Sequence, residues 1–466
     1  MSDGRLAGGI LGAAFLVRLT LYLGTAIFGT DSAQFLLMAD WMSEGRFEDA
    51  LSITYHPLYP MLIAALKPLM SGGTEVAGFW ISMVLGSAAV LPLFFLVRAI
   101  FGRPAAFFAA LIYAFQWHTV ELHADVMTEG TFCFFLYGAA WLCWRAMEDP
   151  SLVRFIVTGI AAVAAYLTRP EGILAVALVI GWPLADLAFR RERPWKRLAG
   201  VSLCGVAMLL LASPFLLWVH SKMGAWKLSA KTSVHKPGPV TPLVEAPKER
   251  NRYVKLTRAI GQVTGVLAPF VLPGFLGLKG HGLRGPLFFF SFPLGYLAGL
   301  LLALRTHPWM SYRYVIPPMG MLLVLAALGM VVALRFMERH RPELKWKAVA
   351  AGVLLFSIFA PCVKAFRPQR QEDEPLREAG LWIRARGGTR VCSTVDKIGF
   401  FIGNPVIAYD ETFEEFKKRV VGERPQYLVY REEDLEKGKP AYLDRLHEVG
   451  ATEPVLLRGV RIHPVR

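Results

Sequence analysis

The chain has 466 residues, 54% of them hydrophobic, and a mean hydropathy of +0.42. This composition is too apolar for a soluble protein and predicts a polytopic membrane protein. The formal net charge is +15, which in a membrane protein usually reflects basic cytosolic loops beside anionic lipid. No pattern of interleaved aromatic and basic residues indicates nucleic-acid binding.

Eleven apolar runs predict membrane-spanning helices. They cover approximately residues 6–28, 76–97, 104–120, 129–147, 152–168, 172–189, 198–220, 259–278, 286–304, 314–335 and 347–365. The runs at 259–278 and 286–304 are the weakest, because prolines interrupt them. No convincing cleavage site follows the first run, so we expect it to remain as the first membrane helix.

Basic residues in short loops set the expected orientation, because such loops stay in the cytoplasm. The densest cluster extends from Arg190 to Arg197, between the sixth and seventh runs. We therefore expect a bacterial inner (plasma) membrane protein with a cytoplasmic N-terminus and an extracytoplasmic C-terminus. Loop 221–258 is then outside although it is strongly basic. It either attracts anionic lipid or phosphate, or is a solvated, proline-rich loop.

The first outward loop, residues 30–75, directly follows the first span. Apolar residues at helical spacing between Ser32 and Glu44 predict an amphipathic helix that lies in the membrane interface. A second amphipathic segment begins at Pro57, a residue favoured at helix starts. Asp31 lies at the membrane surface, where with Gln34 it fits a capping box. Capping and a catalytic role for this carboxylate are equally open from the residues alone.

Ionisable residues gather in the other outward turns: His118, Glu121, His123, Asp125, Glu129, Arg169, Glu171, Arg305, His307 and Arg313. Charged groups at membrane depth are costly and are therefore functional candidates. A carboxylate can serve as a general base, and arginines can stabilise a departing phosphate. The set favours group transfer from a lipid phosphate. Metal binding within His118–Asp125 is the alternative, although no established ligand spacing occurs there. Arg18, inside the first span, is either functional or a structural partner of a carboxylate.

From Phe366 onward the sequence becomes densely charged and predicts a soluble domain, residues 366–466. Strands expected at 389–394, 405–408 and 426–430 alternate with helices at 412–421 and 441–449, which favours a small α/β domain. It carries no glycine-rich phosphate loop, so we expect a cover or docking module. A disulfide between Cys362 and Cys392 is left open.

Five short motifs occur in order between the apolar runs: Thr30-Asp31-Ser32, Tyr55-His56-Pro57-Leu58-Tyr59, Met127-Thr128-Glu129-Gly130, Leu167-Thr168-Arg169-Pro170-Glu171-Gly172 and Arg313-Tyr314-Val315-Ile316-Pro317. In this order the chain resembles bacterial GT-C glycosyltransferases. It is most similar to the dolichyl-phosphate-mannose–protein mannosyltransferase-like family, which includes the lipid A aminoarabinose transferases. The resemblance covers the membrane part and the tail, and it does not specify the sugar.

The resemblance implies a GT-C-like catalytic domain over residues 1–365 and a polyprenyl-phosphate-sugar donor. It implies inverting transfer on the outer face of the membrane to a glycolipid, polysaccharide or protein. We expect no required cofactor, and a divalent metal is the less favoured alternative. By motif position it implies that Asp31 and Glu129 are catalytic, with Asp31 as the base, and that His56, Arg169 and Arg313 lie at the donor phosphate. The secondary candidates, chosen from the residues themselves, are Asp125, His123, Tyr55 and Arg18.

The sequence departs from the family pattern at Ser32-Ala33-Gln34, at Leu58 and at Asp125. These departures leave the base and the phosphate ligands to be established. Two functions of other classes remain as alternatives: a transporter or flippase of a lipid-linked sugar, and a non-catalytic scaffold. Against transport, no inverted repeat occurs and the charged residues gather at one face.

Overall fold

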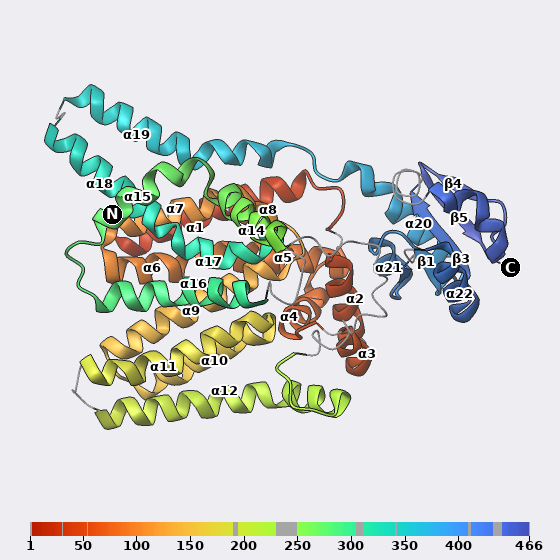
Figure 1. Cartoon of the computed structure of the whole chain (residues 1–466), viewed down its shortest axis with the longest axis horizontal. Coiled ribbons are helices and arrows are strands. Elements are labelled where there is room, and N and C mark those ends of the chain that lie inside the picture. The colour runs from red at the N-terminus through yellow and green to blue at the C-terminus, as the bar shows by residue number, and fades with distance from the viewer. Residues whose placement is uncertain are drawn as a thin grey trace.

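The computed structural model describes residues 2–29, 31–53, 55–189, 194–229, 249–303, 311–340, 343–408, 412–431 and 440–465. They form a body of roughly parallel and antiparallel helices with a smaller domain at one end (Figure 1). The N-terminus lies at the opposite end of this body from the C-terminal domain.

The helices of the body follow the apolar runs. Their bounds are α1 Asp3–Leu23, α5 Gly73–Ala88, α6 Val90–Phe101, α7 Arg103–Phe115, α8 Trp117–His123, α9 Thr128–Glu148, α10 Leu152–Thr168, α11 Ile173–Phe189, α12 Pro194–Met223, α14 Glu249–Thr264, α15 Ala268–Gly277, α16 Arg284–Ala303, α17 Ile316–Leu322, α18 Val324–His340 and α19 Leu344–Phe359. Three shorter helices, α2 Ser32–Ser43, α3 Phe47–Ser52 and α4 Leu58–Leu66, lie at the end nearest the C-terminal domain.

Six helical segments within the described residues are long and apolar enough to cross a membrane, and up to eight if each bent pair is one span. Shorter apolar helices, among them α7 and α10, coincide with other predicted runs. The structure therefore confirms a polytopic helical protein with a small C-terminal sheet domain, but not the predicted number of eleven spans.

The break between α8 and α9 determines where the charged residues lie. The two helices meet at an angle of 111°, and Ala124 to Met127 form the corner between them. At this level α9 crosses α5 closely, since a Cβ atom on Gly130 would lie 3.0 Å from the Cα atom of Gly86. Only glycine permits such an approach. The close crossing fixes the first turn of α9, which carries Glu129.

Helix α2 is more buried than its sequence suggests. Most of its residues are buried, among them Phe35, Leu36, Met38 and Trp41, and it packs against α3, α4, α5 and the C-terminal helix α21 (Lys397–Ile402). Protein therefore covers more than one face of this helix, and its position in the membrane interface stays a prediction. The predicted end is confirmed: α2 stops at Ser43, and Gly45 has a positive φ of 79°.

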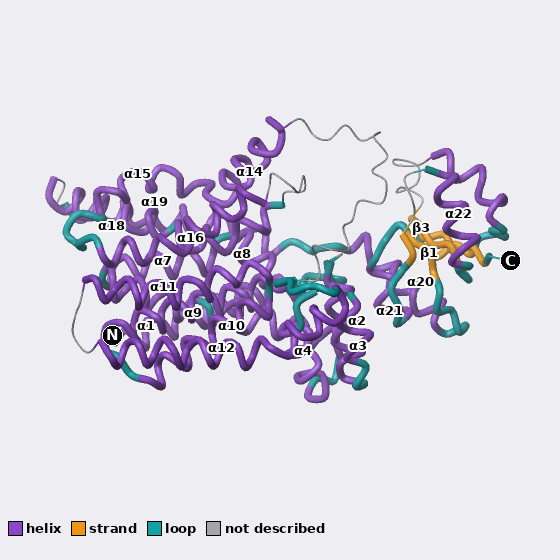
Figure 2. Tube along the Cα trace, turned by 60° about the horizontal axis from the view of Figure 1, so that its bottom comes forward, coloured by secondary structure: helices purple, strands orange, loops and turns teal. Residues whose placement is uncertain are grey.

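The C-terminal domain contains a sheet of five strands in its described residues, in the order β2-β1-β3-β5-β4 (orange in Figure 2). Its elements are α20 Glu374–Arg384, β1 Val391–Ser393, α21, β2 Ile407–Ala408, α22 Phe413–Glu423, β3 Tyr427–Arg431, η7 Pro440–Val449, β4 Val455–Leu457 and β5 Val460–Pro464. Strand β1 pairs parallel to β2 and β3, and β5 pairs antiparallel to β3 and β4. The three predicted strands are confirmed, whereas β4, β5, α20 and α21 were not predicted. No disulfide joins Cys362 and Cys392 in this structure.

Asp125, in the corner between α8 and α9, fastens the C-terminal domain to the helical body. Its Oδ2 accepts a hydrogen bond of 2.8 Å from Arg370, and its Oδ1 accepts one of 3.0 Å from the backbone N–H of Gly29. Arg377 of α20 adds an ion pair of 2.7 Å to Glu75 of α5. One buried carboxylate thus joins the end of the first span, the α8–α9 corner and the start of the C-terminal domain.

We expect Asp125→Asn to lower the free energy of unfolding by about 1–3 kcal/mol, because Arg370 loses its counter-charge and one of the two accepting oxygens becomes an NH₂ group. Thermal unfolding and limited proteolysis near residue 370 measure the effect. As a control, Arg458→Ala removes an exposed ion pair with Glu378 and should change stability by no more than about 1 kcal/mol. Equal stability of the Asp125 and Arg458 variants would contradict this role.

Candidate active site

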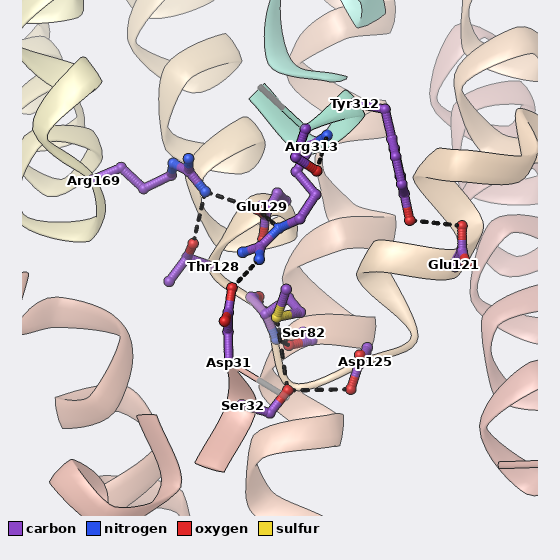
Figure 3. Close-up of polar contacts among 12 residues, drawn as sticks. Asp31, Ser32, Ser82, Glu121, Asp125, Thr128, Glu129, Arg169, Tyr312 and Arg313 are labelled. Atoms are coloured by element: carbon purple, nitrogen blue, oxygen red, sulfur yellow. Dashed lines mark hydrogen bonds and ion pairs between the residues drawn. The ribbon is translucent and has the colours of Figure 1, made fainter. Parts of the chain in front are cut away.

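Arg313 joins the two carboxylates that sequence analysis selected as catalytic. Its Nη1 donates to Oδ2 of Asp31, and its Nε donates to Oε1 of Glu129 at 2.9 Å (Figure 3). Arg313 is presented by the short helix η4 (Tyr312–Val315), at the start of the bent α17–α18 pair. Residues 282 positions apart in the sequence therefore meet above the first turn of α9.

Arg169 approaches Glu129 from the other side. Its Nη1 donates to Oε1 of Glu129 at 2.8 Å and to the hydroxyl of Thr128 at 3.1 Å. Its Nε and Nη2 form a second, forked contact with Glu171 at 3.3 and 3.1 Å. The Arg169 side chain is buried, so these contacts hold it rigidly in place.

The three ionic groups differ in access to solvent, and this difference separates their roles. The side chain of Glu129 is fully buried, that of Arg313 is 22% exposed and that of Asp31 is 47% exposed. Glu129 is thus the anchor that orients both arginines, and its Oε2 has no hydrogen-bond partner among the described residues. Asp31 is the group that an incoming molecule can reach.

The capping-box interpretation of Asp31 is wrong. Asp31 occupies the N-cap position of α2, but its side chain makes no capping hydrogen bond. Its backbone has the αR conformation, with φ −68° and ψ −19°, whereas a capping residue is normally extended. The carboxylate is instead turned toward Arg313, a stronger, charged donor.

Tyr55 and His56 lie in the segment that precedes α4. The ring of Tyr55 lies 4.8 Å from that of Phe35, and burial, with the charge of Asp31 second, raises the pKa of its hydroxyl to about 12. This hydroxyl therefore remains a hydrogen-bond donor near neutral pH. The Nδ1 atom of His56 lies 2.6 Å from the carbonyl oxygen of Tyr166, and its ring packs 4.9 Å from that of Phe215. His56 thus contacts α10 and α12.

Arg18 and His123 meet inside the helical body. Arg18 is fully buried and donates to the carbonyl oxygens of Ala14 and Ala114 at 2.9 and 3.1 Å, while its Nη2 lies 3.4 Å from Nδ1 of His123. Two backbone carbonyl oxygens therefore accept hydrogen bonds from this guanidinium. They take the place of the carboxylate partner that was one of the two interpretations of Arg18. The two side chains join α1 to α7 and α8 beneath the candidate active site.

The four residues considered as metal ligands do not converge on one point. His118 pairs with Glu121 at 3.4 Å, which also accepts from the hydroxyl of Tyr312 at 3.2 Å. His123 faces Arg18, and Asp125 faces Arg370. No group of three or more His, Cys, Asp or Glu residues that could hold a metal occurs in the part of the chain that the structure describes. Thr30, Arg305 and His307 lie outside the described residues.

Comparisons with known proteins find one family model and several solved structures that are similar to this chain. Residues 55–218 match the family model described as dolichyl-phosphate-mannose-protein mannosyltransferase. The solved structure of ArnT from Cupriavidus metallidurans bound to undecaprenyl phosphate aligns with a TM-score of 0.66 and 12% identity, covering 99% of this chain and 98% of that chain. The chain has the GT-C glycosyltransferase fold. The predicted resemblance is thereby confirmed.

A second solved structure extends the comparison to archaea. The oligosaccharyltransferase AglB from Archaeoglobus fulgidus, in complex with an inhibitory peptide and a dolichol-phosphate, aligns with a TM-score of 0.61 and 12% identity. The alignment covers 99% of this chain and 74% of that chain. No curated protein matches the sequence. At these identities the structures establish the fold, and the chemistry must be argued from the residues of this chain.

Glu129→Gln tests the anchor role of this carboxylate. We expect the free energy of unfolding to fall by about 3–5 kcal/mol, because two buried or half-buried guanidinium groups would lose their shared counter-charge. Thermal unfolding in detergent measures this loss. Glu171→Gln is the matched control, because Glu171 is 29% exposed and contacts only Arg169 of the two arginines, so its loss should be smaller. An unchanged midpoint for Glu129→Gln would contradict the assignment.

Proposed function

We propose that the protein is a membrane glycosyltransferase that moves a sugar from a polyprenyl-phosphate-linked donor to an envelope acceptor. The bridge from Asp31 through Arg313 to Glu129 carries this proposal. It joins a reachable carboxylate, suited to proton abstraction, to a guanidinium suited to a leaving phosphate. The GT-C fold and the lipid-phosphate complexes of the two similar structures support the donor class.

In the proposed reaction the acceptor hydroxyl attacks the anomeric carbon of the donor sugar while Asp31 takes the hydroxyl proton. The bond between the anomeric carbon and the phosphate oxygen breaks, and polyprenyl phosphate leaves with the bonding electrons. A single displacement of this kind inverts the anomeric configuration. Arg313 would stabilise the negative charge that develops on the leaving phosphate, because such donors act best where charge appears in the transition state.

The two arginines would have different tasks in this reaction. Among the described residues, the site contains three carboxylates and only two arginines, and each arginine is already paired. A donor phosphate must therefore compete with a carboxylate for a guanidinium. The carboxylates are Asp31, Glu129 and Glu171, and the arginines are Arg169 and Arg313. Arg313 is the more exposed arginine, and its partner Asp31 is the most exposed carboxylate. Phosphate binding would therefore draw Arg313 away from Asp31 and release this carboxylate to act as the base. Arg169 would keep Glu129 and the site walls in position.

A transfer assay tests the proposal. Purified protein is supplied with radiolabelled polyprenyl-phosphate sugars, one at a time, and with an extract of native membranes, in the presence and absence of a chelator. We expect label to move from one donor to an acceptor, in the inverted configuration, and the transfer to persist with the chelator. Absence of transfer from every donor by well-folded protein would overturn the function.

A further inference from the structure

A cleft of about 300 Å³ lies where the C-terminal domain covers α2 and α3. Gln34 and Leu37 of α2 and Ile53, just after α3, line it from the helical body. Asp396, Phe400 and Val406 line it from the C-terminal domain. Figure 1 shows α21 beside α2 at this junction. The volume is at the lower end of the range of roughly 300–1,000 Å³ found for small-molecule sites.

The cleft adjoins the candidate active site. Gln34 lies three residues after Asp31, one helical turn further along α2. Phe28 packs against Phe400 and Phe401, with ring distances of 5.4 and 5.5 Å. These contacts hold α21 against the end of the helical body that carries α2. A molecule in the cleft would therefore extend one end toward Asp31.

Asp396 is the unexplained group in this cleft. It occupies the N-cap position of α21, yet its side chain makes no capping hydrogen bond. Within the described part of the chain its carboxylate has neither an ion pair nor a hydrogen bond, although the residue is only partly exposed. Burial, with the charge of Asp31 second, raises its pKa above the ordinary range. A carboxylate in such surroundings is stabilised when a ligand supplies hydrogen-bond donors.

We propose that this cleft binds a neutral sugar unit of the acceptor, with Asp396 accepting hydrogen bonds from its hydroxyl groups. This inference rests on the proposed function and assigns the acceptor half of the same site. The lining suits such a ligand: Asp396 and Gln34 match sugar hydroxyls, and Leu37, Phe400 and Val406 offer apolar surface to the C–H face of the ring. The lining includes no basic side chain among the described residues, so a phosphorylated or acidic unit would be repelled there.

Ion pairs between the C-terminal domain and the helical body keep the two sides of the cleft together. Arg370 contacts Asp125 and Arg377 contacts Glu75, and these contacts keep α21 beside α2. Asp396 is then a specificity-determining residue that positions the acceptor, whereas Asp31 reacts with it. Displacement of the domain would open the cleft and leave the donor side, which the helical body builds alone, intact.

Kinetics with the full-length protein test this role. The acceptor fraction of native membranes is titrated by its hexose content against wild type, Asp396→Ala, Asp396→Asn and the exposed control Glu372→Gln. We expect Asp396→Ala to raise the acceptor KM at least tenfold, with kcat and the donor KM within twofold of wild type. Asp396→Asn should recover part of the loss, because its amide oxygen still accepts a hydrogen bond. An unchanged acceptor KM, or an equal loss in donor KM, would overturn the inference.

A binding measurement separates this inference from the proposed function, since it needs no donor and no turnover. Saturation-transfer NMR on purified protein uses methyl glucoside and methyl glucoside 6-phosphate as probes. We expect signal transfer to the neutral sugar, a loss of this transfer in the cleft-filling variant Val406→Trp, and weaker transfer to the phosphorylated probe. Equal binding of both probes, or binding that survives Val406→Trp in folded protein, would overturn the sugar cleft. If the neutral sugar binds as expected but no donor supports transfer, only the proposed function fails.

Discussion

Replacing Asp31 with Asn should lower kcat/KM for sugar transfer by roughly 10²–10⁴-fold, the usual contribution of a general base. Asn has nearly the same shape but cannot accept the proton of the acceptor hydroxyl. The side chain is 47% exposed and its partner Arg313 retains Glu129, so the fold should be unaffected. Initial rates with a saturating donor, together with the thermal midpoint, separate the chemical loss from unfolding.

The control for this variant comes from the same loop. Glu48 of α3 is exposed and acidic, and Glu48→Gln makes the same chemical change outside the proposed site. It should transfer sugar at the rate of the wild type. If Asp31→Asn retains full activity, Asp31 is not the base, and the exposed carboxylate must have another role.

Arg313→Ala should have the second large effect, lowering kcat by about 10²–10³-fold, as loss of an oriented charge donor does. The donor KM should rise as well, because the same guanidinium would bind the ground-state phosphate. Arg313→Lys should recover only part of the activity, since an ammonium group lacks the planar fork that now contacts two carboxylates. Steady-state kinetics with a titrated donor give both parameters.

Arg46 supplies the matched control, because it is an arginine of the first loop that contacts two carboxylates, Glu44 and Asp49, in solvent. Arg46→Ala should leave both kcat and the donor KM within twofold of wild type. A donor KM for Arg313→Ala equal to that of wild type, in folded protein, would exclude Arg313 from the phosphate site.

Much of the membrane part was predictable because its signals are local. Apolar runs determine the helices of the body, and the motifs around Asp31, Glu129, Arg169 and Arg313 marked residues that the structure brings into contact. The motifs could not reveal the order of burial among them. That Glu129 is the buried anchor and Asp31 the exposed end depends on packing against distant helices, which a local pattern does not contain.

The errors come from long-range partners. A capping box at Asp31 was one of two open interpretations because the local sequence allows it, but Arg313 provides a stronger partner from far along the chain. Asp125 was a candidate site residue because it lies in an outward turn beside Glu129. Only the fold shows that it binds Arg370, which lies 245 residues away. Likewise the packing of α21 against α2 joins segments far apart in the sequence, which the local pattern of α2 does not indicate.

The last strands of the C-terminal domain were missed for a different reason. Strand β4 alternates between half-buried and exposed positions and is only three residues long, so its hydrophobic signal is weak. The position of Asp396 in the cleft could not be predicted either, since nothing near it in the sequence distinguishes it from a helix cap. Both become visible only when the sheet places α21 against α2.

If this protein transfers sugar, and does not merely move a lipid-linked sugar across the membrane, reconstitution should show it. Proteoliposomes would contain the purified protein, the acceptor fraction and the donor that supports transfer, labelled in its sugar. We expect labelled acceptor and free polyprenyl phosphate to appear in a one-to-one ratio. Label that crosses the bilayer while still attached to its polyprenyl carrier, with no labelled acceptor and no released carrier, would contradict it.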